Sequence, residues 1–258
     1  MKIDWHEFLR NWSRDMLAAP LGADLPADVR AAASLGFPPA TDEQIAQTES
    51  RLKIPLPPSY RAFLKVSNGW RQTSHFISRV SAVQDIDWFR AQNRDWVKAF
   101  TGPLRYGPRD EVPDQDYFSY GQFAEHFRPT HLKETLQISE VGDAAVYLLN
   151  PQIIDKDGEW EAWFFANWLP GAHRYRSFED LMQAEYSQFA GIEWKQPVGV
   201  IDELPQEFVG SPGSAKRKIK KRSKPREPKI LGKALANGLW RSFLDSFRIR
   251  TSTLFIQR

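Results

Sequence analysis

The chain has 258 residues, of which 41% are hydrophobic and 13% aromatic, and this composition supplies enough apolar surface for one packed core of roughly 200 residues with an appendage. It contains no cysteine, which excludes disulfide scaffolds and thiolate metal sites and fits a reducing compartment. No stretch reaches the ~18 apolar residues of a membrane span, and the first 20 residues lack the apolar segment of a secretory signal, so we expect a cytoplasmic protein.

The formal net charge of +3 conceals two parts of opposite sign. Residues 1–210 contain 21 Lys and Arg against 30 Asp and Glu, a net charge of −9, whereas residues 211–258 contain 14 against 2, a net charge of +12. We therefore predict one folded domain over 1–210. Residues 211–233 hold ten Lys or Arg and no aromatic residue, a composition typical of a disordered basic linker. Residues 234–258 regain apolar side chains at a spacing that would allow an isolated amphipathic helix in this tail.

The N-terminal segment carries its apolar side chains on one helix face. They recur at three- and four-residue intervals: Trp5, Phe8, Leu9, Trp12 and Met16. Asp4, with Glu7 three positions later, resembles a helix N-terminus, so we predict a helix over 4–17. Residues 18–36 are rich in Ala, Pro and Gly and predict a connection with one helical turn at 27–34.

Two short amphipathic helices follow between residues 37 and 70. Thr41 with Gln44 three positions later forms a capping box that opens a helix over 42–52. Three prolines at 55, 57 and 58 end it, because proline lacks the amide proton that a helix interior needs. The second helix begins at Pro58 or Ser59, and Gly69 suits a left-handed position at its end. We expect structural roles for eight residues of this stretch: Leu56, Pro57, Tyr60, Phe63, Leu64, Asn68, Gly69 and Trp70.

The middle of the chain predicts strands separated by turns. Residues 71–90 favour a strand and then a turn, 91–100 a short helix, and 101–130 a turn-rich surface excursion. Apolar residues alternate with polar ones from Leu132 to Ile138, the period of a half-buried strand.

A hairpin turn at 142–143 then leads into a strand over 144–149 that is apolar on both faces, which predicts a central position in the sheet, and Asn150-Pro151 ends it. A second turn at 155–158 precedes a strand over 159–168 whose two faces both carry aromatic residues. Ser177 caps a last helix that Gly191 closes.

The sequence offers little catalytic or metal-binding chemistry. Five histidines are scattered without metal-ligand spacing, so we expect no metal and no cofactor. Asp155-Lys-Asp-Gly158 resembles the opening of a calcium loop, but Ala166 stands where the loop needs its bidentate Glu, which favours a plain turn. No phosphate-binding loop, dinucleotide fingerprint or nucleophile elbow is present, and we expect no enzymatic activity.

Two groups of residues are candidates for binding a partner. An acidic run lies beside tyrosines, and aromatic residues lie in and after the last strand: Asp110, Glu111, Asp114, Asp116, Tyr117, Tyr120, Trp163 and Trp168. Exposed aromatic side chains are common interface anchors, although Trp163 and its neighbours would serve equally as core. Paired carboxylates in the acidic run could also do acid/base work in a hydrolase, but no nucleophile or metal ligand lies near them in the sequence.

The helix pair carries a family resemblance. Gly36-Phe-Pro-Pro-Ala-Thr41, Leu56-Pro-Pro-Ser-Tyr60, Phe63-Leu64 and Ser67-Asn-Gly69 resemble the core signature of the SUKH superfamily, which contains fungal cell-wall assembly regulators and many bacterial immunity proteins. Later features follow in the same order, so that the resemblance spans roughly residues 3–190; it does not cover 211–258.

The resemblance implies an α+β fold, with a mostly antiparallel sheet flanked by helices, and a non-enzymatic protein-binding function. For bacterial members it implies an immunity protein that neutralises a polymorphic toxin, often a nuclease. The net charge of −9 over residues 1–210 fits a basic partner. The alternative is a nucleic-acid-associated or regulatory scaffold protein that acts through the basic residues at 216–229.

Overall fold

The computed structural model describes residues 3–74, 76–103, 112–120, 123–191 and 206–207. The chain divides into two units, Met1–Gly210 and Ser211–Arg258, and every described residue belongs to the first. The predictions for the basic linker at 211–233 and for the tail at 234–258 therefore lie outside the described residues.

An antiparallel sheet runs through the middle of the first unit, in the order β3-β4-β5-β6-β7, and β8 pairs with the far end of β5. Its strands are β3 (Asp87–Trp88), β4 (Leu136–Gln137), β5 (Ala145–Ile154), β6 (Trp160–Ala166), β7 (Ala172–Tyr175) and β8 (Gln206–Glu207). A separate pair consists of β1 (Trp70–Arg71) and β2 (Arg79–Val80). The prediction of an α+β fold with a mostly antiparallel sheet is confirmed.

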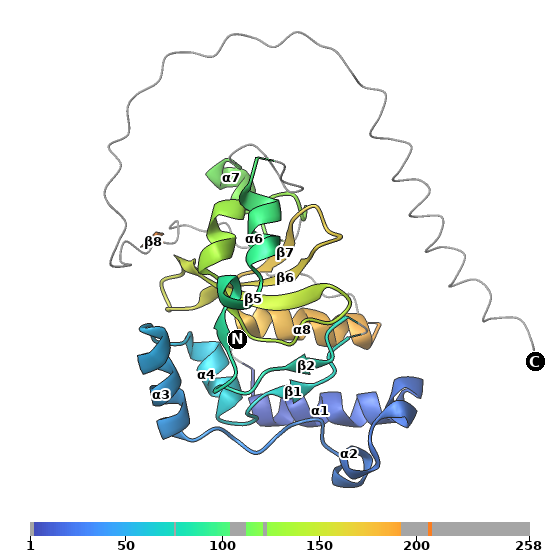
Figure 1. Ribbon diagram of the computed structural model, residues 1–258. Helices are drawn as coiled ribbons and strands as arrows, with labels where there is room; N and C mark the ends of the chain where they lie inside the picture. The colour runs from blue at the N-terminus through green and yellow to red at the C-terminus, as the bar shows by residue number, and fades with distance from the viewer. Residues whose placement is uncertain (1–2, 75, 104–111, 121–122, 192–205, 208–258) are drawn as a thin grey trace, which may run out of the picture. The chain divides into compact units, whose positions relative to one another are not determined.

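Helices cover both faces of this sheet (Figure 1). One layer holds α1 (Trp5–Ala18), α2 (Ala27–Ala32), α3 (Asp42–Leu52), α4 (Pro58–Leu64) and α8 (Phe178–Phe189). The other holds α5 (Phe89–Gln92), α6 (Arg94–Thr101), α7 (Asp114–Tyr117) and the 3-10 helix η2 (Pro129–Glu134). A second 3-10 turn, η1 (Pro20–Asp24), follows α1.

The alternation of side chains along β6 produces two cores. Trp160, Ala162, Phe164 and Ala166 face the core shared with α1, α3, α4 and α8. Trp163 and Phe165 face the smaller core beneath α5, α6 and η2. Every residue of β6 is buried, as the sequence predicts for a strand covered on both faces.

Local signals place the helix ends. Asp4 accepts hydrogen bonds from the amides of His6 and Glu7 at the start of α1. The capping box of Thr41 and Gln44 is present at the start of α3, with both reciprocal hydrogen bonds. Ser177 caps α8 by accepting from the Asp180 amide. All three predicted helices are confirmed, because each is specified by residues within one turn.

Gly69 has a different role from the one predicted. The helix α4 ends at Leu64, and Gly69 lies beyond it, in the turn into β1. Its φ of +100° is in the region that favours glycine, and a Cβ there would approach the Val80 carbonyl oxygen to 2.7 Å. Gly69 therefore permits the close approach of β1 and β2 and does not close a helix.

Three strand predictions are wrong in part. Leu132 belongs to η2, which begins with Pro129, so the strand that follows is only Leu136–Gln137. Pro151 does not end β5, which continues to Ile154; the pairing with β6 becomes irregular after Asn150, where a residue without an amide proton is tolerated. The stretch 71–90 holds the last residue of β1 and two separate two-residue strands, β2 and β3, instead of one continuous strand.

Candidate functional site

A buried ion pair between two strands lies under α7. Glu161 of β6 and Arg174 of β7 have side chains that are 0% and 3% exposed, and Glu161 Oε1 accepts from Arg174 Nη1 at 2.8 Å. Glu161 Oε2 accepts three further hydrogen bonds, from the Tyr117 hydroxyl (2.7 Å), Asn150 Nδ2 (2.8 Å) and Trp163 Nε1 (2.7 Å). Tyr120 is a further hydrogen-bonding partner of this carboxylate, which is therefore fully engaged and acts as an anchor.

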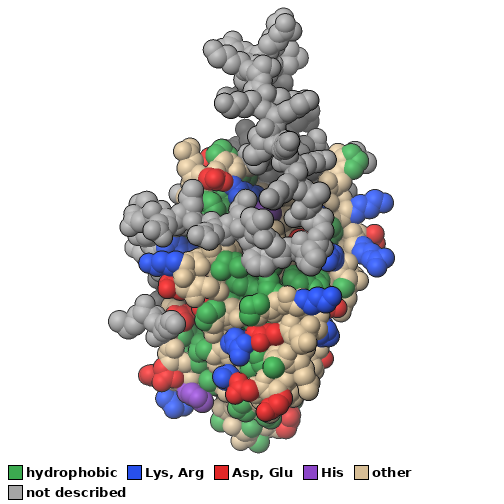
Figure 2. Space-filling view, turned by 90° about the vertical axis from the view of Figure 1, so that its left-hand side faces the viewer, with side chains coloured by type: hydrophobic (Ala, Val, Ile, Leu, Met, Phe, Trp, Pro, Cys, Tyr) green, Lys and Arg blue, Asp and Glu red, His purple; other side chains and the backbone are tan. Residues whose placement is uncertain are grey.

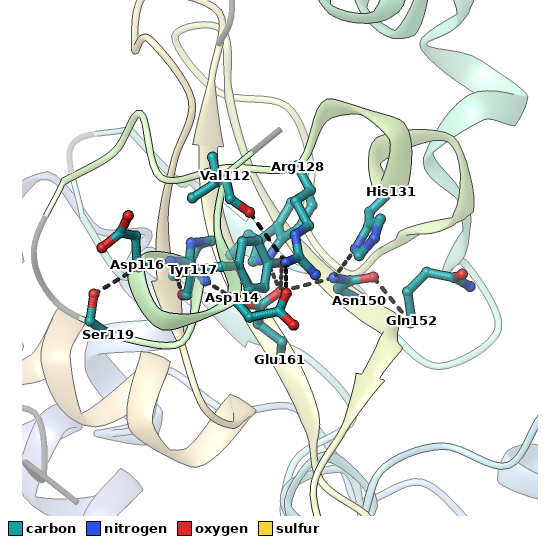
Figure 3. Close-up of polar contacts among 12 residues, drawn as sticks. Val112, Asp114, Asp116, Tyr117, Ser119, Arg128, His131, Asn150, Gln152 and Glu161 are labelled. Carbon is teal, nitrogen blue, oxygen red and sulfur yellow. Dashed lines mark hydrogen bonds and ion pairs between the residues drawn. The ribbon is translucent and has the colours of Figure 1, made fainter. Parts of the chain in front are cut away.

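The register of the sheet brings these groups together. Asn150 is the direct partner of Glu161 across β5 and β6, and Arg174 is the partner of Trp163 across β6 and β7. Tyr117 reaches them from α7, so the network joins three strands to a helix (Figure 3).

Two guanidinium groups lie over the Tyr117 ring. Arg174 and Arg128 are 4.0 and 4.1 Å from its centroid. Arg128 also forms an ion pair with Asp114 of α7 and donates to the Val112 carbonyl oxygen (3.4 Å) (Figure 3). Stacking and the ion pair together hold α7 against the sheet, since each links α7 to residues outside it.

His131 of η2 borders this network as a neutral side chain. Burial lowers its pKa to about 4, with the Glu161 charge opposing and the charges of Arg128 and Arg174 adding to the shift. Its Nδ1 lies 3.2 Å from Asn150 Nδ2, an arrangement in which the amide donates to the unprotonated nitrogen. The imidazole therefore stays uncharged at neutral pH.

The predicted partner-binding residues fall into two places. Tyr117 and Trp163 are fully buried in the network, so their side chains support the surface without presenting to it. Asp114 is exposed and Asp116 half-buried, and both lie in α7. Tyr120 follows α7 and is half-buried; its ring centroid lies 5.2 Å from the Arg174 guanidinium and its side chain hydrogen-bonds with Glu161, so it belongs to the network. Asp110 and Glu111 lie outside the described residues.

Trp168 lies elsewhere, beyond the end of β6. It is 42% exposed, its ring centroid is 5.2 Å from that of Phe76, and its Nε1 donates to the Asp143 carbonyl oxygen (3.0 Å). Val141, which is 45% exposed, immediately precedes the turn at 142–143 that contains Asp143. These three side chains, Phe76, Val141 and Trp168, form what we call the apolar rim. Val141 and Trp168 are exposed and Phe76 is half-buried. Apolar side chains at the surface favour a contact with another macromolecule.

The eight residues with predicted structural roles lie in or beside the larger core. Seven of them are buried: Leu56, Pro57, Tyr60, Phe63, Leu64, Gly69 and Trp70. Asn68 accepts from the Val83 amide (2.7 Å) and donates to Gln84 Oε1 (3.2 Å). These are structural contacts, and none of the eight takes part in the network of Glu161.

Sequence reasoning missed the members of the network that carry charge. Glu161 and Arg174 drew no attention because they are far from the acidic run in sequence. A signal was present: Glu161 stands inside a strand predicted to be covered on both faces, and a buried carboxylate requires a partner.

A second buried carboxylate, Glu185 of α8, lies in the larger core. Its Oε2 accepts from the Tyr147 hydroxyl (2.6 Å), which in turn is 2.7 Å from the Thr73 hydroxyl, and Tyr175 is the other titratable neighbour. Burial raises the pKa of Glu185 to about 7, and the hydrogen bond from Tyr147 opposes that shift.

Glu185 should make stability depend on pH in a defined window. Because its folded pKa of about 7 is above the unfolded value of 4.5, its contribution is complete below pH 4.5 and is lost as the pH rises through 7. The loss amounts to about 3 kcal/mol. Glu185→Gln keeps an acceptor for Tyr147 and cannot ionise, so the free energy of unfolding of the wild type, relative to this variant, should fall between pH 4.5 and 7.

Urea unfolding at several pH values measures this difference. The wild type must be compared with the variant, because His131 titrates in both proteins. The lowered pKa of His131, about 4, makes stability rise with pH from 4 to 6.5, and this rise would mask the Glu185 effect if the wild type were measured by itself. Glu125→Gln, on an exposed side chain, is the control and should leave the profile unchanged. A pH-independent difference between wild type and Glu185→Gln would show that Glu185 keeps an ordinary pKa.

The described residues contain no group of three or more His, Asp or Glu placed to hold a metal ion. None of the helices in the described ranges combines the length and the apolar character that crossing a bilayer requires.

A profile described as the SMI1 / KNR4 family (SUKH-1) matches residues 39–184. The matched segment begins just before α3 and ends within α8, so it takes in the helix pair, strands β1 to β7 and the network of Glu161, whereas Glu185 lies one residue beyond it. A search of curated proteins finds no match.

Proposed function

Since the chain belongs to the SMI1/KNR4 family (SUKH-1), we propose that it is a non-enzymatic protein-binding domain and, more narrowly, an immunity protein that neutralises a bacterial toxin. The family match over residues 39–184 is the observation that carries the proposal, because it covers the pair β1–β2 and the five strands β3 to β7 of the main sheet. The superfamily that the helix pair resembles includes both toxin antidotes and regulators that act by binding proteins.

Charge supports a basic partner. The net charge of −9 over residues 1–210 would attract a basic protein, such as a nuclease domain, and speed the encounter. On the face drawn in Figure 2, acidic and basic side chains are interspersed and hydrophobic ones gather across the middle. The attraction on this face would therefore come from the summed field, with apolar contacts supplying the fit.

Binding to the toxin domain encoded beside its gene tests the proposal. We expect a dissociation constant in the nanomolar range, on the order of 10⁻⁷–10⁻¹⁰ M, and an association rate that falls as salt is raised. Co-expression should restore growth to cells that produce the toxin. Titration calorimetry and a growth assay measure the two effects; if neither binding nor protection occurs, the immunity function is refuted.

Truncation after Gly210 separates this proposal from its alternative. A chain of residues 1–210 retains the acidic unit, and should bind the toxin as tightly as the full chain. The nucleic-acid alternative predicts instead a salt-sensitive binding of DNA or RNA that requires residues 216–229 and disappears on truncation.

A further inference from the structure

β2 and β3 lie one after the other along the segment 136–140, which begins with β4. Val80 bridges Ser139, and Asp87 pairs with Gln137, so two steps along the segment 137–139 correspond to seven along its partner. The residues in excess leave this pairing as a loop over 81–86, which we call the excursion. The stretch that the sequence predicts as one strand is thus interrupted in its middle.

The excursion is fastened to the helical layer. Val83 donates its amide to Asn68 Oδ1 (2.7 Å) and accepts at its carbonyl from Thr48 Oγ1 (3.0 Å). Arg51 of α3 donates to the Ile86 carbonyl oxygen (2.7 Å). Val83 and Ile86 are buried in the larger core. With both its polar and apolar groups fixed, the excursion gives the interruption a defined shape before any ligand binds.

A hollow of about 380 Å³ opens at this interruption. Its lining includes one large aromatic ring and three carboxylates: Trp88, Asp85, Asp87 and Glu140. Gln137 and Arg79 also contribute to the lining. An aromatic face beside carboxylates is the chemistry that recognises a guanidinium or an ammonium group, through a cation–π contact and charge-assisted hydrogen bonds.

The charge balance in the hollow favours a cation. Arg79 lies 4.7 Å from the centre of the Phe37 ring and 3.8 Å from Glu140, and Arg51 lies 3.7 Å from Asp87. Both ion pairs are longer than a hydrogen bond and half-exposed, so each neutralises its carboxylate weakly. Asp85 is exposed and pairs with no cation of the described residues. Three carboxylates against two guanidinium groups leave a negative surplus.

The hollow continues into the apolar rim. Val141 lines the hollow and is 45% exposed, and the turn that follows it accepts from Trp168 Nε1 through the Asp143 carbonyl oxygen. Phe76 contacts Trp168 with ring centroids 5.2 Å apart. A polar hollow beside exposed aromatic side chains fits a protein surface better than a free amino acid, because only the protein can cover both.

We propose that the hollow between β2 and β3 binds an arginine or lysine side chain of a protein partner, whose neighbouring apolar residues cover the apolar rim. The inference rests on the proposed protein-binding function and assigns it a surface other than the one above Glu161. The partner's cation would lie against Trp88, with Asp85 and Glu140 as its counter-ions.

Small probes test the hollow without any knowledge of the partner. We expect N-acetyl-arginine methylamide to shift the Trp88 indole resonance of the full chain saturably in the millimolar range, in spectra assigned with Trp88→Phe. The citrulline analogue, which is nearly isosteric and neutral, should cause less than a fifth of that shift. Equal shifts from the two probes would overturn the proposal, since the hollow would then not select a cation.

Matched variants test the carboxylates. Asp85→Asn combined with Glu140→Gln should weaken binding of the arginine probe at least fivefold, and these exposed, isosteric changes preserve the fold. Asp28→Asn with Glu125→Gln alters the net charge equally at exposed sites outside the hollow and should have no effect. An equal loss in both double variants would assign the effect to overall charge and refute the site.

The cognate toxin domain distinguishes a protein side chain from a free ligand. Asp85→Asn with Glu140→Gln should lower its affinity at least tenfold, whereas Asp28→Asn with Glu125→Gln should change it less than twofold. Probe binding with unchanged toxin affinity would overturn the assignment to a protein partner. Wild-type binding of the arginine probe without any toxin binding would count against the immunity function while leaving the cation selectivity of the hollow intact.

Discussion

Replacing Arg174 by alanine should lower the free energy of unfolding by about 3–5 kcal/mol, because it leaves the Glu161 carboxylate buried without its counter-ion. The two side chains are 3% and 0% exposed, so water cannot take the place of the guanidinium. The change also removes a cation from the Tyr117 ring, and with it a contact that holds α7. Urea unfolding followed by circular dichroism measures the loss, and hydrogen exchange should rise at residues 114–120.

A double variant separates the missing counter-ion from lost packing. Arg174→Met with Glu161→Gln removes both charges and keeps most of the volume, so it should be more stable than Arg174→Ala alone. The exposed pair of Arg90 with Glu134 is the control: Arg90→Ala should cost less than about 1 kcal/mol. If Arg174→Ala were as mild as Arg90→Ala, the pair of Glu161 and Arg174 would not act as a buried ion pair that stabilises the fold.

Elements specified by neighbouring residues could be predicted from the sequence. The capping box at Thr41 and the cap at Ser177 each need only a partner three positions away, and the alternation along β6 reports which side chains face which core. The family signature could be read for the same reason, since its residues crowd into 37–70. Local physics determines these features before tertiary packing acts.

Features that depend on distant partners could not be predicted. The intrinsic preference of proline predicts that the strand ends at Pro151. The strand β5 nevertheless continues to Ile154, because the pairing with β6 is already irregular after Asn150. The excursion at 81–86 has a strand-like composition, and only the contacts of Val83 with Asn68 and Thr48 pull it away from the segment 137–139.

The candidate binding surfaces also combine features that could be predicted from the sequence with features that could not. The sequence places Asp114 and Asp116 beside Tyr117, but it does not show that Tyr117 is buried on an ion pair that joins β6 to β7. It singles out Trp168 as an anchor, but the hollow next to the rim combines residues from 79 to 141. It emerges only when β3 pairs with β4 and Val80 of β2 bridges Ser139. Binding surfaces assembled from several strands leave no local pattern to read.

Phe63→Ala is expected to have an effect as large as that of Arg174→Ala, about 3–5 kcal/mol, in the opposite layer of the molecule. The ring is fully buried, and it contacts Trp5 of α1 at 5.4 Å and Phe178 of α8 at 5.1 Å between centroids. Truncation would leave a cavity among three helices that are distant in sequence. Neighbouring large rings, each in contact with others, cannot collapse into it without leaving their own contacts.

Phe63→Leu is the matched control, since it keeps most of the apolar volume and should cost less than about 1.5 kcal/mol. Urea midpoints at constant m-value give both numbers. A loss below about 1 kcal/mol for Phe63→Ala would contradict the packing of α4 between α1 and α8. Phe63 does not line the hollow, so each variant should still bind the arginine probe as long as it remains folded. This result would separate the residues that stabilise the fold from the exposed carboxylates that we assign to partner binding.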